Sequence, residues 1–185
     1  MEYNFPMIPR LMKFISETLQ AIVFAGAIFL FVYLLLAQPH KISGASMEPN
    51  FIDNEYLLTN KVSYRLREPE RGEVVVFEAP PNGEKDFIKR IIALPGETVR
   101  ISGNRVFVNG VELVEPYLPL GTETRSTSFF PENQVVAVPE NSYFVLGDNR
   151  DHSLDSRTFG FIKKDSITGK AWFVYWPPQL AGSGD

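Results

Sequence analysis

The pattern of hydrophobic positions divides the chain near residue 40. Residues 21–37 are apolar without interruption, and no residue between Glu17 and Lys41 carries a fixed charge. At a rise of about 1.5 Å per residue, a helix that includes this run spans the roughly 30 Å hydrocarbon core of a bilayer. We therefore predict a single transmembrane helix over residues 19–38, preceded by an N-terminal cytoplasmic segment over residues 1–18.

Two other interpretations of the apolar run are less favoured. A buried core helix of this kind would be unusual in a chain of only 185 residues. A cleavable secretory signal would need an unusually long apolar region, and Leu35-Leu36-Ala37 is a poor small-x-small cleavage site. We therefore expect an uncleaved signal anchor. Arg10 and Lys13 precede the run whereas Lys41 alone follows it closely, which favours a cytoplasmic N-terminus.

Beyond the apolar run, the pattern becomes that of short strands separated by turns. Runs rich in β-branched and aromatic residues alternate with Gly, Pro and Asn, and no 3.6-residue period persists. Asn109-Gly110 is a strong hairpin signal, because both residues accept positive φ. The series predicts a mainly β fold, either a sandwich or a barrel. The predicted strands lie within 74–77, 87–92, 98–113, 135–138, 143–146 and 171–175.

Composition narrows the possible chemistry. The chain has no Cys, which excludes disulfides, Cys-ligated zinc, iron–sulfur clusters and a thiol nucleophile. It has two His, at positions 40 and 152, so a His-rich metal site is not expected, and we predict neither a metal nor a cofactor. The net charge of −4 argues against a nucleic-acid partner, because such proteins concentrate Lys and Arg to contact phosphates.

Ser46 is a candidate nucleophile. It lies among small residues in the segment Ser43–Pro49, where an irregular backbone can expose both a hydroxyl and a neighbouring N–H. A serine nucleophile with an oxyanion hole needs both groups. Taken alone, the segment is more typical of an ordinary turn serine, so the hypothesis depends on a base elsewhere in the chain.

Lys89 and His152 are the candidates for that base. Strand alternation places Phe87, Lys89 and Ile91 on one face, where apolar neighbours can desolvate the amine. Desolvation disfavours the charged form, and lowering a lysine pKa from about 10.4 to about 8 costs roughly 3 kcal/mol. The alternative for Lys89 is a surface lysine that keeps its ammonium group in water.

Residues 147–157 form a dense polar segment. Three Asp, two Arg and two Ser occur within these eleven residues, enough for a network of ion pairs and hydrogen bonds. A solvated loop is one alternative. A calcium loop of the EF-hand type is another, but it requires Gly at its sixth position and Glu at its twelfth, where this chain has Ser153 and Phe159.

Together these segments resemble the conserved boxes of bacterial type I signal peptidases, which are membrane-bound endopeptidases with a Ser/Lys catalytic dyad. The segment 43–49 resembles the nucleophile box, 71–77 a structural box, 89–97 the general-base box and 147–157 the last box. The resemblance runs from the apolar anchor to about residue 176. Any one box is moderately specific, whereas all four in this order behind an anchor are highly specific.

The resemblance implies a Ser/Lys signal-peptidase-like β fold on a single N-terminal transmembrane helix. The catalytic β domain would comprise residues 39–97 and 144–178, with a small inserted β region at 98–143 and a C-terminal tail at 179–185. Residues 115–133 are polar and rich in Ser, Thr and Pro, and we expect a long mobile loop there.

The resemblance also implies roles for individual residues. Ser46 would be the nucleophile, and Lys89, neutral in the resting enzyme, would be its general base. Ser153 would orient Lys89 by a hydrogen bond, and His152 would be a bystander where relatives often carry Asn. The implied structural ion pairs are Arg90–Asp148 and Asp155–Arg157, and the implied apolar pocket residues are Ile42, Met47, Phe51 and Ile88.

Two positions depart from the family pattern. Beside the backbone N–H of the nucleophile, some members use a serine hydroxyl two residues earlier as a second oxyanion donor, but this chain has Gly44 there. Asn50 stands where relatives often have Thr.

The implied function is the removal of signal peptides from exported preproteins after an Ala-x-Ala sequence. The enzyme would be single-pass in the bacterial cytoplasmic membrane, with its catalytic domain on the extracytoplasmic side. Its expected partners are the lipid bilayer and signal peptides, which would bind as an added strand. Two alternatives stay open: a catalytically inactive, membrane-anchored β binding module of the same fold, and a self-cleaving Ser/Lys repressor-type protein. The anchor and the lack of a DNA-binding segment disfavour the second.

Overall fold

The structure is a computed structural model that describes residues 7–80, 83, 85–177 and 182–183. It divides into two compact units, Met1–Ala37 and Gln38–Asp185, each of which is described by itself.

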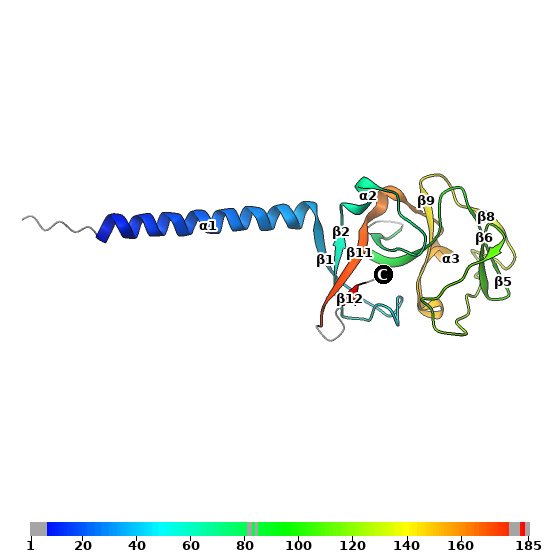
Figure 1. The fold of residues 1–185 in the computed structure, drawn as a ribbon. Coiled ribbons are helices and arrows are strands. Elements are labelled where there is room, and N and C mark those ends of the chain that lie inside the picture. Colours follow the sequence, from blue (N-terminus) through cyan, green and yellow to red (C-terminus); the bar gives the residue numbers. More distant parts are fainter. Residues whose placement is uncertain (1–6, 81–82, 84, 178–181, 184–185) are drawn as a thin grey trace, which may run out of the picture. The chain divides into compact units, whose positions relative to one another are not determined.

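The first unit contains one long helix, α1 (Met7–Leu35), drawn in blue in Figure 1. Its residues Pro9–Tyr33 have the length and composition of a membrane span, with a mean hydropathy of 1.9, and the protein buries none of them. Such an apolar, uncovered helix is suited to lipid, where all its backbone groups are paired internally. The end of the predicted span differs: Ala37 and Gln38 begin a strand, because Pro39 disfavours helical geometry at the preceding residue.

The second unit is built on two β-sheets, which confirms the predicted mainly β fold. The first sheet has the strand order β1-β2-β11-β3-β4-β9-β10, and β12 pairs with β11. Its strands are β1 (Ala37–Lys41), β2 (Tyr56–Asn60), β3 (Val74–Glu78), β4 (Asp86–Ala93), β9 (Ser142–Leu146), β10 (Ile162–Lys163), β11 (Ile167–Trp176) and β12 (Gly182–Ser183). Short helical turns connect them: α2 (Ser63–Leu66), η1 (Arg150–His152), α3 (Ser156–Phe159) and η2 (Lys164–Ser166).

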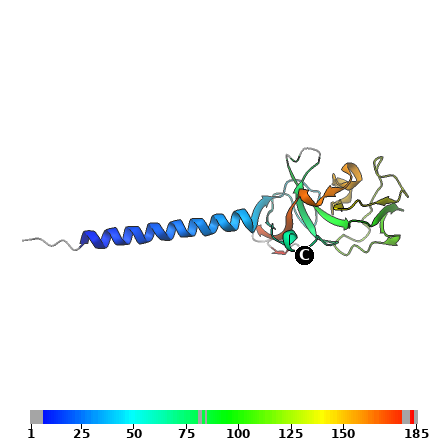
Figure 2. The ribbon, with the colours of Figure 1, turned by 90° about the horizontal axis from the view of Figure 1, so that it is seen from above.

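The second sheet has the order β7-β6-β5-β8 and falls within the range predicted for the inserted region. Its strands are β5 (Thr98–Ser102), β6 (Arg105–Val108), β7 (Val111–Glu112) and β8 (Val136–Ala137). The predicted Asn109-Gly110 hairpin is present, with φ of 51° and 81° at these two residues. In Figures 1 and 2, this sheet and the β1–β2–β11 part of the first sheet lie at opposite ends of the unit.

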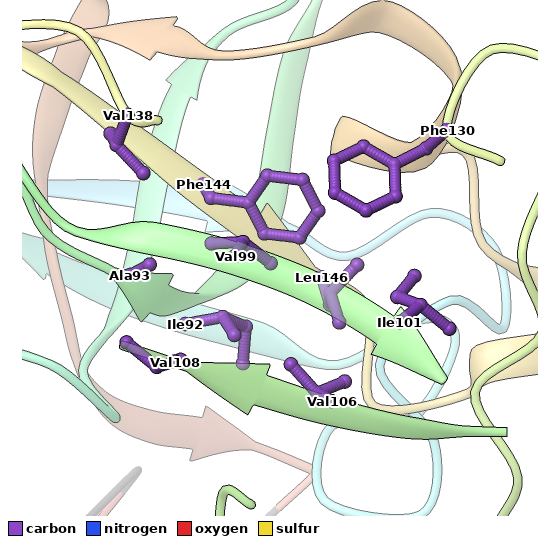
Figure 3. Close-up of a cluster of buried hydrophobic side chains, with 10 residues drawn as sticks. All are labelled: Ile92, Ala93, Val99, Ile101, Val106, Val108, Phe130, Val138, Phe144 and Leu146. Carbon is purple, nitrogen blue, oxygen red and sulfur yellow. The ribbon is translucent and has the colours of Figure 1, made fainter. Parts of the chain in front are cut away.

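The two sheets share a hydrophobic core, shown in Figure 3. Side chains of β5 and β6 pack there against side chains of β4 and β9, so the inserted sheet is supported by the same strands that lead to residues 89 and 147. The buried members are Ile92, Ala93, Val99, Ile101, Val106, Val108, Phe130, Val138, Phe144 and Leu146.

The segment 115–133, predicted as a long mobile loop, contains no helix or strand but is fixed at several points. Phe130 is 3% exposed in the shared core, and Glu115 forms an ion pair with the buried Arg150. The polar composition did not indicate these contacts, because they depend on partners far away in the sequence.

The C-terminal tail predicted over 179–185 is described only in part. Gly182 and Ser183 pair with Val174 and Phe173 of β11, and the other residues of that range lie outside the described residues, as does residue 178.

Candidate active site

The structure brings Ser46 and Lys89 together, although 43 residues separate them in the sequence. Lys89 Nζ lies 2.7 Å from Ser46 Oγ, within hydrogen-bond distance. Ser46 lies in the turn that follows β1, whereas Lys89 lies in β4 and also donates to its neighbour, the Ile88 carbonyl, at 2.7 Å. Within the described residues, the Ser46 hydroxyl has no other hydrogen-bond partner.

Lys89 is 3% exposed, which makes the surface-lysine alternative wrong. Burial lowers the pKa of Lys89 to about 8, against the negative charges of Asp155 and Asp148, which raise it. With that pKa, about one molecule in ten carries a neutral amine at pH 7. A neutral amine next to a hydroxyl can accept its proton, which is what a general base must do.

His152, the other candidate base, does not contact Ser46. Its ring is exposed, and Nδ1 lies 3.2 Å from Asn149 Oδ1. His152 lines the cleft that adjoins Ser46 and Lys89, but the structure gives its imidazole no hydrogen bond to the Ser46 hydroxyl.

The nucleophile turn is held by the loop that follows β9. The Asn149 backbone N–H donates to the Ser46 carbonyl at 3.1 Å, and its Nδ2 donates to the Ala45 carbonyl at 3.0 Å. The approach is so close that a Cβ on Gly147 would lie 2.4 Å from the Ser46 carbonyl oxygen and 2.2 Å from Ser153 Oγ. Position 147 therefore requires glycine.

The backbone N–H of Ser46 is available as an oxyanion donor, since it has no acceptor among the described residues. At the position where some relatives have a second donor, a serine hydroxyl, this chain has Gly44. Its φ of +95° favours glycine over serine, and its own backbone N–H already donates to Asp53 Oδ1 at 2.8 Å. A second side-chain donor at this position is therefore absent, as the sequence indicated.

Ser153 does not make the hydrogen bond that the resemblance implied. Its Oγ is buried and finds no hydrogen-bond partner in the part of the chain that the structure describes. The orienting role of Ser153 is therefore not formed as a hydrogen bond in this structure.

Both implied ion pairs are formed and buried. Arg90 Nε and Nη2 bind Asp148 at 2.9 and 2.6 Å, while Arg157 Nε and Nη2 bind Asp155 at 2.9 and 2.8 Å. Asp155 also accepts from the Gly147 N–H at 3.1 Å. Removing one partner of such a pair leaves an uncompensated buried charge, so these contacts fix the backbone next to the site.

A cleft of about 290 Å³ adjoins Ser46 and Lys89. Ile42 and Ile88 line it as predicted, but Met47 and Phe51 do not: they are 1% and 2% exposed in the core. The turn bond from the Phe51 N–H to the Met47 carbonyl puts these two side chains on the same inward face. The prediction missed several other lining residues, among them His40, Leu57, Val76 and Asp86.

Hydrophobicity alone could not have separated cleft from core at these positions. Strand alternation was the signal available for His40, since it places that residue on the same face as Ile42. Among the described residues, no group of three or more His, Asp or Glu side chains is arranged to hold a metal ion.

Comparison with known proteins identifies the family of this chain. The family model described as "Signal peptidase, peptidase S26" matches residues 15–176. A "Probable signal peptidase I-2" from Synechocystis sp. is 41% identical over 167 residues, covering 88% of this chain and 72% of its own. A "Signal peptidase IB" from Staphylococcus aureus is 36% identical over 178 residues, covering 89% of this chain and 91% of its own.

A solved structure of a signal peptidase I from Enterococcus faecalis is 35% identical, covers 56% of this chain and 97% of its own, and has a TM-score of 0.46. The family match over most of the chain and the extent of the sequence identity to the first two relatives confirm the resemblance: the chain belongs to the signal peptidase S26 family.

Proposed function

We propose that this chain is a membrane-bound serine endopeptidase that cleaves signal peptides from exported preproteins, with Ser46 as nucleophile and Lys89 as general base. The observation that carries the proposal is the 2.7 Å contact between the Ser46 hydroxyl and a buried amine whose pKa is about 8. The family membership supports the reaction, and the chemistry of the two side chains supports their roles.

The reaction would proceed in two proton-balanced steps. Neutral Lys89 takes the proton of the Ser46 hydroxyl as Oγ attacks the scissile carbonyl. The oxyanion that forms accepts a hydrogen bond from the backbone N–H of Ser46. The Lys89 ammonium then protonates the leaving amine, so the carbon–nitrogen bond breaks and an ester to Ser46 remains. Lys89, again neutral, removes a proton from a water molecule as its oxygen attacks the ester carbonyl. The Lys89 ammonium then returns this proton to Ser46 Oγ as the ester bond breaks.

The free edge of β4 provides a place for an extended substrate. Residues 86–89 pair with β3 on one side, whereas pairing with β9 begins only at Arg90. A peptide added along this edge would satisfy main-chain groups of the strand. Its side chains would point toward Ile42 and Ile88, which line the cleft, and we propose that small side chains, as in Ala-x-Ala, are preferred there.

The anchor would place this chemistry at a membrane. Ser46 follows the end of α1 at Leu35 by eleven residues, which limits the span of the connecting chain to about 40 Å. Trp172 and Trp176 of β11 are 54% and 55% exposed, and such aromatic side chains suit the bilayer interface. We propose the bacterial cytoplasmic membrane, with the catalytic domain on the extracytoplasmic side, where exported signal peptides present their cleavage sites.

The experiment is cleavage of a purified preprotein by the full-length chain in detergent, with the cut located by mass spectrometry. We expect one cut after an Ala-x-Ala sequence, unaffected by EDTA. Binding of the preprotein without any cut would favour the inactive binding module. Cleavage of the chain itself and not of the preprotein would favour the self-cleaving alternative.

The Ser153→Ala substitution is expected to lower turnover without lowering stability. The hydroxyl has no hydrogen-bond partner among the described residues, so its removal relieves an unsatisfied buried group and the Tm should be unchanged or higher. We expect the same hydroxyl to accept the remaining amine N–H of Lys89 during turnover. Tm and kcat measured on the same preparation test this, and an unchanged kcat would contradict an orienting role.

A further inference from the structure

The side chain of Asn50 joins the nucleophile turn to two distant parts of the fold. Asn50 lies four residues after Ser46, and its Nδ2 donates to Asp148 Oδ2 and to the Tyr117 carbonyl, both at 2.8 Å. An amide nitrogen has two hydrogens, and these two bonds use both of them. Neither acceptor belongs to the nucleophile turn itself.

The bond to Asp148 leads to the strand that carries Lys89. Asp148 is held in two hydrogen bonds by Arg90, the residue directly after Lys89 in β4. Its side chain is fully buried, and that of Arg90 is 6% exposed. A short path of hydrogen bonds therefore runs from the turn of Ser46 through Asn50 and Asp148 to β4.

The bond to Tyr117 leads to the 115–133 segment, which does not line the cleft. The Arg90 guanidinium lies 4.0 Å from the centre of the Tyr117 ring, and the Tyr117 hydroxyl donates to Glu115 at 2.6 Å. Glu115 pairs with Arg150, whose Nε donates to the Gly147 carbonyl at 3.0 Å. The path thus returns to the loop against which the Ser46 turn packs.

From this arrangement we infer that Asn50 is a positioning residue, which holds the Ser46 hydroxyl at its 2.7 Å distance from Lys89 and connects the 115–133 segment to the active site. The inference rests on the proposed function, since it assumes that these two groups react. Small displacements of reacting groups are costly: about 1 Å can lower a rate about a hundredfold. An Asn50 that only stabilised the fold would instead change Tm and leave kcat unaltered.

The test compares Asn50→Ala and Asn50→Thr in the full chain. We expect Asn50→Ala to lower kcat at least about tenfold while KM changes less than about twofold. Asn50→Thr keeps one donor and should recover part of the lost kcat. The matched control is Asn60→Ala, because Asn60 Oδ1 accepts two hydrogen bonds, from the Val62 and Ser63 N–H groups, that do not involve the site. It should lower Tm and leave kcat near the wild-type value.

The outcomes separate this inference from the proposed function. Suppose that the wild-type chain cleaves its substrate but Asn50→Ala keeps kcat within twofold of wild type, or loses no more kcat than Asn60→Ala at equal Tm. The inference about Asn50 is then overturned, and the proposed function stands. If the wild-type chain does not cleave, the proposed function fails and the inference fails with it.

Discussion

Ser46→Ala is expected to lower the kcat of cleavage by a factor of at least about 10⁴. The substitution removes the single atom that would form the covalent bond to substrate, and no other hydroxyl among the described residues contacts Lys89. The fold should be unaffected, because the Lys89 amine keeps its bond to the Ile88 carbonyl and nothing new is buried. Turnover of an Ala-x-Ala peptide in detergent, together with Tm, measures both effects.

The matched control is Ser43→Ala, which removes the other serine hydroxyl of the same segment. This serine also lines the cleft, but none of its groups is bonded to Lys89. We expect most of the activity to remain. Two results would contradict the assignment of the nucleophile. One is near wild-type turnover in Ser46→Ala, and the other is a Ser43→Ala enzyme as inactive as Ser46→Ala.

Local pattern was sufficient for most of the fold. The uninterrupted apolar run indicated α1, and β-branched runs bounded by Gly, Pro and Asn indicated the strands. Pattern could not show how the strands combine, because the order β1-β2-β11-β3-β4 brings together residues more than a hundred positions apart. Nor could it show that 115–133 is anchored, since Phe130 is buried by side chains of both sheets.

The candidate site was predictable in its chemistry and less so in its detail. Ser46 and Lys89 were identified by the resemblance, and strand alternation gave a physical reason for a desolvated amine. Of the four residues expected in the substrate pocket, Ile42 and Ile88 line the cleft, whereas Met47 and Phe51 are buried in the core and do not line it. The hydrogen bond expected of Ser153 is absent, since its buried hydroxyl has no partner among the described residues, and no one-dimensional pattern contains that detail.

The position of Asn50 shows what the structure adds. In the sequence it was a departure from the family pattern without an explanation. In the structure its two bonds explain it: a threonine offers one hydroxyl donor, whereas the asparagine amide reaches both Asp148 and the Tyr117 carbonyl. The departure therefore coincides with a contact to the 115–133 segment, which suggests that residue 50 and this segment depend on each other.

The activity of the wild-type chain is expected to rise with pH through a midpoint near pH 8. Burial lowers the pKa of Lys89 to about 8, and only the neutral amine can accept the Ser46 proton. The active fraction is therefore small below this pKa and approaches one above it. Lys89→Arg should be inactive across the whole range, because a guanidinium stays protonated and cannot act as a base. The measurement is kcat/KM for an Ala-x-Ala peptide between about pH 6 and 10.

Two variants make this result specific to Lys89. Lys163→Arg replaces an exposed lysine of β10 and should keep the wild-type profile, which shows that the loss in Lys89→Arg is not a general effect of the exchange. His152→Asn removes the second candidate base that the sequence indicated. If His152 acted as the base, activity would be lost in this variant at every pH. If Lys89 is the base, His152→Asn leaves the limb near pH 8, because its exposed ring makes no hydrogen bond to Ser46. Loss of activity in His152→Asn, or substantial activity in Lys89→Arg, would contradict the serine–lysine mechanism.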